Sequence, residues 1–160
     1  MTTTTGDIES GAPQPHGPVV FAYDGSELAK LAIDEAGRQL APGRDALVLT
    51  VWQPFDVGFV PTVALRVNAA EIAQVRDAAE RTAADGASLA QAAGFKARSL
   101  EAEAAPTWKG IVRAADEHDA SLIVLGSHGR TGLAGVLLGS VAEAVAAHSR
   151  GSVLIVHRRD

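Results

Sequence analysis

Residues 121–140 read SLIVLGSHGRTGLAGVLLGS, and this stretch decides the fold class. Its first part, Ser121–Leu125, is a short and nearly continuous apolar run, which is typical of a strand covered on both faces of a sheet. Glycines then recur every third residue from Gly126 to Gly135, and a helical pattern begins near Ser140. The stretch therefore predicts an α/β protein in which this strand leads through a glycine-rich loop into a helix.

The same alternation of apolar runs and helical spacing continues through the rest of the chain. Between the runs, apolar residues recur at helical intervals, which places an apolar stripe on one face of each predicted helix. A weaker alternation at Lys96–Ala104 supplies a third strand, so the predicted order of elements is βαβαβαβαβ. The further strands are predicted at Pro18–Tyr23, Ala46–Trp52 and Ser152–His157, and the helices at 28–40, 66–93, 107–118 and 141–148.

Strands that alternate with helices indicate a parallel sheet with right-handed crossovers. Five strands are too few for an eight-stranded barrel, and they fit an open, doubly wound, Rossmann-like five-stranded parallel sheet of order 3-2-1-4-5 with helices on both faces. In that order the winding reverses between the first and fourth strands, and ligands bind beyond the carboxyl ends of strands at such a point. The two ends are Tyr23–Ser26 and Gly126–Gly129, both polar and turn-like. We therefore expect the binding site there.

Composition and charge restrict the class of protein. The chain has 160 residues, enough for one domain, and a net charge of −5, so we expect no nucleic-acid or membrane partner. Cysteine is absent, which excludes disulfides and thiolate chemistry and is compatible with a reducing compartment. We find neither a secretory signal nor an apolar stretch long enough to span a membrane. We expect a disordered tail over residues 1–17, one domain over 18–159, and a cytoplasmic protein.

The glycine-rich loop that follows Leu125 is suited to holding a phosphate. Glycines let backbone N–H groups approach a ligand closely, and the positive end of the helix behind them stabilises an anion. The loop lacks the Walker A pattern GxxxxGK[ST], and no GxGxxG fingerprint follows the first strand, which weakens the standard ATPase and dehydrogenase interpretations. Taken alone, the loop is equally typical of a tight surface connection. Ser140 also has a structural interpretation, because with Glu143 it is predicted to form a capping box.

The glycines and their neighbours resemble a known family. The spacing Gly126-x2-Gly129-x9-Gly139-Ser140 resembles the ATP-binding pattern of universal stress proteins. Over about residues 19–156 the agreement extends to Tyr-Asp-Gly-Ser-Glu after the first strand, Gly-Ser-Val-Ala-Glu at the last helix and Val-Leu-Ile-Val at the end. The resemblance implies a fold like that of the adenine nucleotide alpha hydrolases and a regulator of the stress response. It also implies a homodimer, formed through the C-terminal strand, with ATP in each subunit and Mg²⁺ or Mn²⁺ on the phosphates.

The resemblance also assigns roles by position. Asp24 and the backbone near Val51 are expected to contact the adenosine, whereas the loop and the start of the last helix surround the ribose and phosphates. The resemblance implies no catalytic side chain and no side chain that binds a metal. The residues assigned to the nucleotide are Asp24, Val51, Gly126, Ser127, Gly129, Arg130, Gly139, Ser140 and Val141.

Several of these residues have a second interpretation. Asp24 is also placed to cap the helix that follows it, with Glu27 three residues on. Arg130 either neutralises phosphate charge or is simply solvated. Trp52 either packs over the nucleotide or fills core space, as most aromatic residues do. Residues 53–65 match no firm family pattern, so the shape of the pocket stays open.

Three functions are compared on these grounds. The first is an ATP-binding stress regulator. The second is a slow ATPase or phosphotransferase, for which only Asp24 supplies a candidate base near the loop. The third is a nucleotide-free dimeric interaction module that pairs through the edge strand Ser152–His157. Ser127 and His128 are not expected to act as a catalytic pair, because adjacent residues seldom reach each other in hydrogen-bonding geometry and no GxSxG elbow is present.

Overall fold

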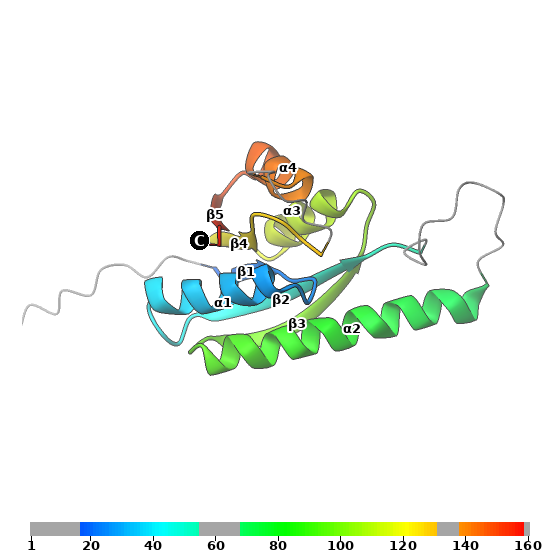
Figure 1. Cartoon of the computed structure of the whole chain (residues 1–160), viewed down its shortest axis with the longest axis horizontal. Coiled ribbons are helices and arrows are strands. Elements are labelled where there is room, and N and C mark those ends of the chain that lie inside the picture. Colours follow the sequence, from blue (N-terminus) through cyan, green and yellow to red (C-terminus); the bar gives the residue numbers. More distant parts are fainter. Residues whose placement is uncertain (1–16, 55–67, 131–137, 159–160) are drawn as a thin grey trace, which may run out of the picture.

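The computed structural model describes residues 17–54, 68–130 and 138–158 of the chain (Figure 1). The predicted tail up to residue 16, the stretch 55–67 and residues 131–137 of the glycine-rich loop lie outside these ranges. Strands and helices alternate as predicted, and each boundary lies within three residues of its predicted position. The elements are β1 (Val19–Ala22), α1 (Glu27–Gln39), β2 (Asp45–Trp52), α2 (Ala69–Ala92), β3 (Lys96–Glu103), α3 (Thr107–Glu117), β4 (Leu122–Gly126), α4 (Ser140–His148) and β5 (Ser152–Val156).

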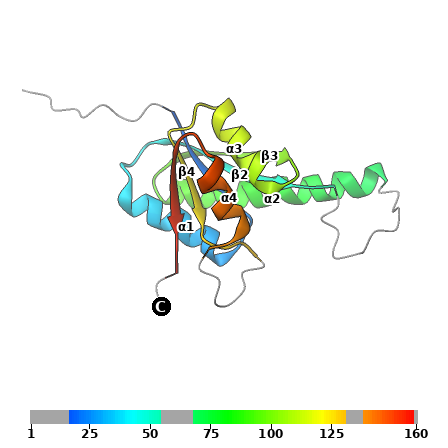
Figure 2. The same cartoon turned by 90° about the horizontal axis from the view of Figure 1, so that it is seen from above.

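The five strands form one parallel sheet in the order β3-β2-β1-β4-β5, which confirms the predicted fold class. β1 lies in the centre and pairs with β2 from Val19↔Ala46 to Ala22↔Leu49. On its other side it pairs with β4, so the winding of the chain reverses between these two strands. Helices α1 and α2 cover one face of the sheet, and α3 and α4 cover the other (Figures 1 and 2).

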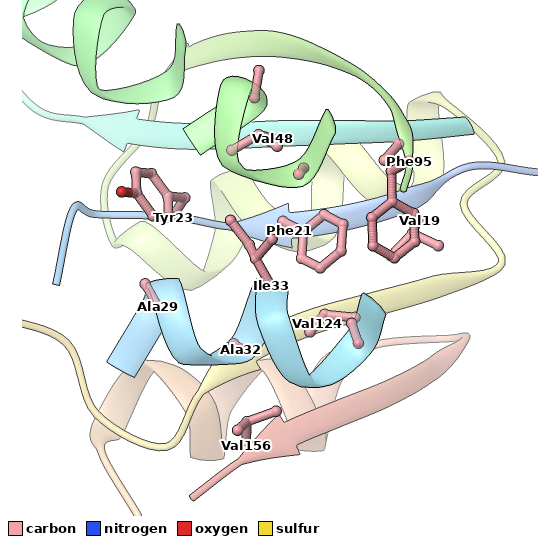
Figure 3. Packing of buried hydrophobic residues seen from close by; sticks show 14 residues of the cluster. Val19, Phe21, Tyr23, Ala29, Ala32, Ile33, Val48, Phe95, Val124 and Val156 are labelled. Atoms are coloured by element: carbon pink, nitrogen blue, oxygen red, sulfur yellow. The ribbon is translucent and has the colours of Figure 1, made fainter. Parts of the chain in front are cut away.

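The face under α1 and α2 holds the larger aromatic side chains. Phe21 of β1 is 1% exposed and lies between Ile33 of α1 and Phe95, in the turn between α2 and β3 (Figure 3). The two phenyl rings meet edge to face, with centroids 5.1 Å apart and planes at 72°. Such a geometry is favoured by the ring quadrupoles and contributes about 0.5–1.5 kcal/mol beyond the burial of area.

The opposite face of the sheet is covered by α3 and α4. Because side chains alternate along a strand, Val20 points to this face while Phe21 points to the other. Val20 packs there with Ile111 of α3 and Val145 of α4. Both faces of β1 are therefore buried, which is why its sequence is a continuous apolar run rather than an alternating one.

Gly86, near the middle of α2, is needed for packing, although glycine has a low helix propensity. A β-carbon at this position would lie 2.6 Å from the ring of Tyr23 and 2.7 Å from the side chain of Val48. Real β-carbons do not approach other atoms so closely. The glycine therefore lets α2 lie directly against β1 and β2, at a cost of about 1 kcal/mol in intrinsic helix propensity.

Helix α2 has 24 residues and begins with a capping box. The Asn68 side chain accepts a hydrogen bond from the Glu71 backbone at 2.9 Å, and the Glu71 carboxylate accepts one from the Asn68 backbone at 3.1 Å. Further along, Arg76 pairs with Glu80 and with Glu101 of β3. Within the described ranges, no helix combines the length and the apolar character that crossing a bilayer requires.

Candidate functional site

A cavity of about 510 Å³ opens beyond the carboxyl ends of β1, β2 and β4. Its volume lies in the range of roughly 300–1,000 Å³ that is typical of small-molecule sites. The cavity lies at the predicted switch point, where the chain ends that follow β1 and β4 come together. All of the residues that the sequence analysis assigned to the nucleotide line this cavity. They are Asp24, Val51, Gly126, Ser127, Gly129, Arg130, Gly139, Ser140 and Val141.

Asp24 ties the two chain ends together. Its Oδ1 accepts a hydrogen bond from the backbone N–H of Ser26 at 2.9 Å, and its Oδ2 accepts one from the backbone N–H of Arg130 at 3.0 Å. The predicted capping role is wrong, because the N-cap of α1 is Ser26, whose hydroxyl accepts from Ala29 at 3.2 Å. The physical reason is Gly25, whose φ of +80° turns the chain after Asp24, so that the cap falls two residues later, on Ser26.

Gly129 is required by the approach of Asp24. A β-carbon at Gly129 would lie 2.7 Å from Oδ2 of the Asp24 carboxylate. A side chain at this position would therefore displace the carboxylate from the Arg130 N–H that it accepts from. Gly129 therefore makes room for the carboxylate of Asp24, in addition to any room that it leaves for a ligand.

The start of α4 presents uncapped backbone N–H groups to the cavity. Gly139 is the N-cap and makes no side-chain capping bond, so the predicted capping box between Ser140 and Glu143 is wrong. Ser140 is already the first helical residue, one position too late for its hydroxyl to cap the helix. The first-turn N–H groups of Ser140, Val141 and Ala142 have no acceptor within the helix, and these residues line the cavity. This arrangement favours an anion.

One backbone hydrogen bond closes the described base of the glycine-rich loop. The N–H of Gly139 donates to the carbonyl of Ser127 at 2.7 Å, while the N–H of Ser127 donates to Val156 of β5 at 2.8 Å. The end of β4, the start of α4 and the end of β5 are therefore held in one register. The N-terminus of α4 is positioned over the cavity by this register.

Ser127 and His128 do contact each other, which corrects the sequence-based expectation. Ser127 Oγ lies 3.1 Å from His128 Nδ1, because the turn after β4 brings the two adjacent side chains to the same side. No carboxylate bonds to this imidazole in the described part of the chain, so no third group completes a triad. The other ring nitrogen, Nε2, is buried and has no hydrogen-bond partner. Equally, no group of three or more potential metal ligands occurs among the described residues.

Val51 offers backbone groups to the cavity because β1 is shorter than β2. The last pair between these strands is Ala22↔Leu49, and the N–H of Tyr23 then donates to the carbonyl of Leu49 at 2.8 Å. Peptide groups two residues apart on a strand face the same side, so the N–H and C=O of Val51 also face the side of β1. No strand of the described residues lies beside them there, because β1 has already ended.

The structure adds residues that sequence reasoning missed. Thr107 begins α3 beside Val51, and its hydroxyl accepts a hydrogen bond from Gln53 Nε2 at 3.4 Å. Gly110 lets α3 approach, since a β-carbon there would lie 3.0 Å from Val51. Pro106 indicates where α3 starts in the sequence. No local pattern shows which strand has its end next to the start of this helix. The lining residues outside both the assigned set and the predicted strand ends are Ala22, Ala29, Leu49, Thr107, Ile111, Leu125 and Ala142.

Three remaining side chains of interest have different environments. Arg130 is exposed and lines the cavity. Trp52 is 6% exposed, does not line the cavity, and donates its indole N–H to Glu101, which favours its interpretation as a core residue. Burial raises the pKa of Tyr23 above its ordinary value, so its phenol stays neutral at physiological pH.

Comparison with known sequences gives a consistent result. A sequence model of the Universal stress protein family matches residues 16–157. A universal stress protein of Mycobacterium tuberculosis is 30% identical over 158 residues, covering 91% of this chain and 48% of that protein. A second, from Mycolicibacterium smegmatis, is 33% identical over 146 residues, covering 89% of this chain and 46% of that protein. The chain thus spans about half the length of the curated relatives it matches.

Solved structures share the fold. Protein MJ0577 of Methanocaldococcus jannaschii superimposes with a TM-score of 0.74 at 24% identity, over 92% of this chain and 99% of that one. The crystal structure of a universal stress protein in complex with cAMP superimposes with a TM-score of 0.63 at 30% identity. That match covers 91% of this chain and all of the other.

Proposed function

The chain belongs to the universal stress protein family, and on that premise we propose that it binds ATP and acts as a nucleotide-dependent regulator of the stress response in the cytoplasm. One observation carries the proposal. The residues assigned to the nucleotide come from the ends of three strands, the glycine-rich loop and the start of α4, and they line a single cavity. A loop that served only as a surface connection would not require this convergence.

The cavity beside β2 suits the adenine base. The N–H and C=O of Val51 face the side that β1 leaves open, and they complement the N1 acceptor and the N6 donor of adenine. Leu49 and Ile111 belong to one apolar cluster under α3 and α4, and both supply apolar surface to the cavity. The universal stress protein solved with cAMP, at 30% identity, supports an adenine nucleotide as the class of ligand.

The opposite end of the cavity suits phosphates. The uncapped N–H groups at the start of α4 and the exposed cation of Arg130 are the described groups that favour negative charge. Among the residues described, no cluster of carboxylates that could bind a metal ion occurs. A bound Mg²⁺ or Mn²⁺ would therefore be held by the phosphate oxygens, and it would neutralise part of their negative charge.

A regulatory role fits the site better than fast catalysis. Asp24 is the candidate general base, yet each of its two oxygens already accepts a backbone N–H. A carboxylate whose two oxygens are both engaged by backbone donors is not directed at an attacking water or hydroxyl. Hydrolysis is therefore expected to be slow, and nucleotide occupancy to be the signal.

We expect nucleotide-stripped protein to bind ATP with micromolar affinity in the presence of Mg²⁺. Isothermal titration calorimetry measures this directly, with adenosine and GTP titrated in parallel. Adenosine should bind more weakly, because it lacks the phosphates that the start of α4 attracts, and GTP should bind more weakly because its N1 is a donor. An absence of heat and of competition at millimolar ATP would overturn the proposal and leave the nucleotide-free interaction module.

We further propose a homodimer formed through β5. This strand lies at the edge of the sheet and pairs only with β4. The carbonyl of Val156 accepts from Ser127 on the β4 side, so the backbone groups of Val153 and Ile155 face outward. Both side chains are half-buried against α3 and α4, so the open edge has an apolar setting. Such an edge is a template for pairing with a second copy.

A Val153→Pro variant is expected to convert the dimer to a monomer. Proline removes the outward N–H of Val153 and breaks no bond to β4, because that N–H points away from the sheet. Light scattering after size-exclusion chromatography gives the mass. The matched control is Val153→Thr, which has the same shape and keeps the N–H, and it should stay dimeric. A Val153→Pro protein with the mass of the wild-type dimer would refute pairing through this edge.

A further inference from the structure

The imidazole of His128 holds a buried nitrogen that the fold leaves without a partner. His128 Nε2 has no hydrogen bond, and it is the only such buried side-chain atom among the residues that the structure describes. A buried polar atom without a partner is rare in folded proteins and costs stability. His128 also lines the cavity beside Gly129 and Gly139, so the unsatisfied atom belongs to a residue of the proposed nucleotide site.

The contact with Ser127 determines which form of the ring is present. Ser127 is 2% exposed, and its hydroxyl has one partner in the described structure, His128 Nδ1 at 3.1 Å. A buried hydroxyl must donate its hydrogen to an acceptor, and Nδ1 is the acceptor within reach. A neutral ring that accepts at Nδ1 carries its proton on Nε2. His128 Nε2 is therefore a buried donor that lacks an acceptor.

The position of the ring shows what kind of acceptor is missing. Cδ2, which is bonded to Nε2, lies 3.8 Å from the point that a β-carbon on Gly139 would occupy, so this edge of the ring faces the start of α4. The start of α4 supplies donors, namely its first-turn N–H groups, and these residues line the same cavity as His128. The nearby carboxylate of Asp24 already accepts two N–H groups. A phosphate oxygen is the acceptor that such a set of donors attracts.

We propose that His128 Nε2–H donates a hydrogen bond to a phosphate oxygen of the bound nucleotide, and that Ser127 positions the ring and holds it in the tautomer that makes this possible. The inference rests on the proposed function and adds to it a side-chain ligand for the phosphates. On this proposal, the unsatisfied donor gains its acceptor when the nucleotide binds.

Two substitutions distinguish the contributions of the two ring nitrogens to binding. Asparagine places its amide near the position of Nδ1, whereas glutamine reaches the position of Nε2. We expect His128→Asn to weaken ATP and AMP binding about tenfold, the loss of one hydrogen bond to a charged group, with adenosine binding unchanged. His128→Gln should keep ATP affinity within about threefold of the wild type. Calorimetry with ATP, AMP and adenosine measures the three variants, wild type included.

The possible results are distinguishable. Equal losses for all three ligands in both variants, adenosine included, would show that His128 only shapes the loop, and unchanged ATP binding by His128→Asn would also overturn the inference. Binding of no ligand by the wild type would instead overturn the proposed function itself. Nitrogen-15 spectra of the wild-type imidazoles give a second test that needs no variant. They should show an Nε2–H tautomer whose resonance moves on addition of ATP but not of adenosine.

Discussion

A Gly139→Val variant is expected to bind ATP at least about a hundredfold more weakly than the wild type, a loss of about 2.7 kcal/mol. A β-carbon at this position would lie 3.0 Å from the carbonyl oxygen of Ser127, which is a backbone atom and cannot turn aside. The same carbonyl accepts the N–H of Gly139 at 2.7 Å. Valine must lengthen this bond, and the start of α4 then moves away from the phosphates. Calorimetric titration with ATP and Mg²⁺ measures the loss.

The control for Gly139→Val is the same substitution at a glycine outside the site. Gly151 precedes β5, and a β-carbon there would meet one atom, the carbonyl oxygen of Ala120 at an ordinary 3.7 Å. Gly151→Val should bind ATP as the wild type does. Thermal unfolding of both variants shows whether the fold is kept. If Gly139→Val bound ATP with wild-type affinity, the start of α4 would not be the phosphate site.

A Phe21→Ala variant is expected to lose about 3–5 kcal/mol of the free energy of unfolding. Phe21 is 1% exposed in the central strand, and its removal leaves a cavity between Ile33 and Phe95 that close packing prevents from collapsing. For a domain of this size, each kcal/mol lowers the unfolding temperature by about 2–4 °C. Urea unfolding followed by circular dichroism gives the free energy, and calorimetry gives the temperature.

Two further variants test the reason given for Phe21. Leu89→Ala truncates a large apolar side chain at a residue that is 38% exposed, and it should change stability by less than about 1 kcal/mol. A double-mutant cycle of Phe21→Ala with Phe95→Ala should show a coupling of about 0.5–1.5 kcal/mol from the edge-to-face contact. Additive losses would mean that the two rings are buried side by side without that specific interaction.

The proposed slow hydrolysis and the proposed stress role would make nucleotide occupancy the signal. A bound nucleotide would add negative charge beside the base of the glycine-rich loop, which bonds to the end of β5 through Ser127 and Val156. β5 is also the proposed dimer edge. A nucleotide that shifts this base could therefore bias how two copies pair, provided it binds the two arrangements with different affinity.

The sequence by itself determined the order of elements, the class of fold and the location of the site. Apolar runs such as Ser121–Leu125 and helical stripes such as that of residues 28–40 are local patterns, because the period of a strand or helix is set by the backbone. Five strands in that alternation leave few ways to wind, so the order 3-2-1-4-5 and the switch point follow. The motif also named residues that the structure brings together in one cavity.

The tertiary structure alone decided which groups those residues use. Helix caps depend on shifts of one or two residues, and the caps are Ser26 rather than Asp24 for α1 and Gly139 rather than Ser140 for α4. The backbone of Val51 is open only because β1 ends before β2, and Gly86 is needed only because Tyr23 and Val48 lie against it. The unsatisfied nitrogen of His128 likewise depends on what surrounds the ring. These features arise from contacts between distant segments, and no local period records such contacts.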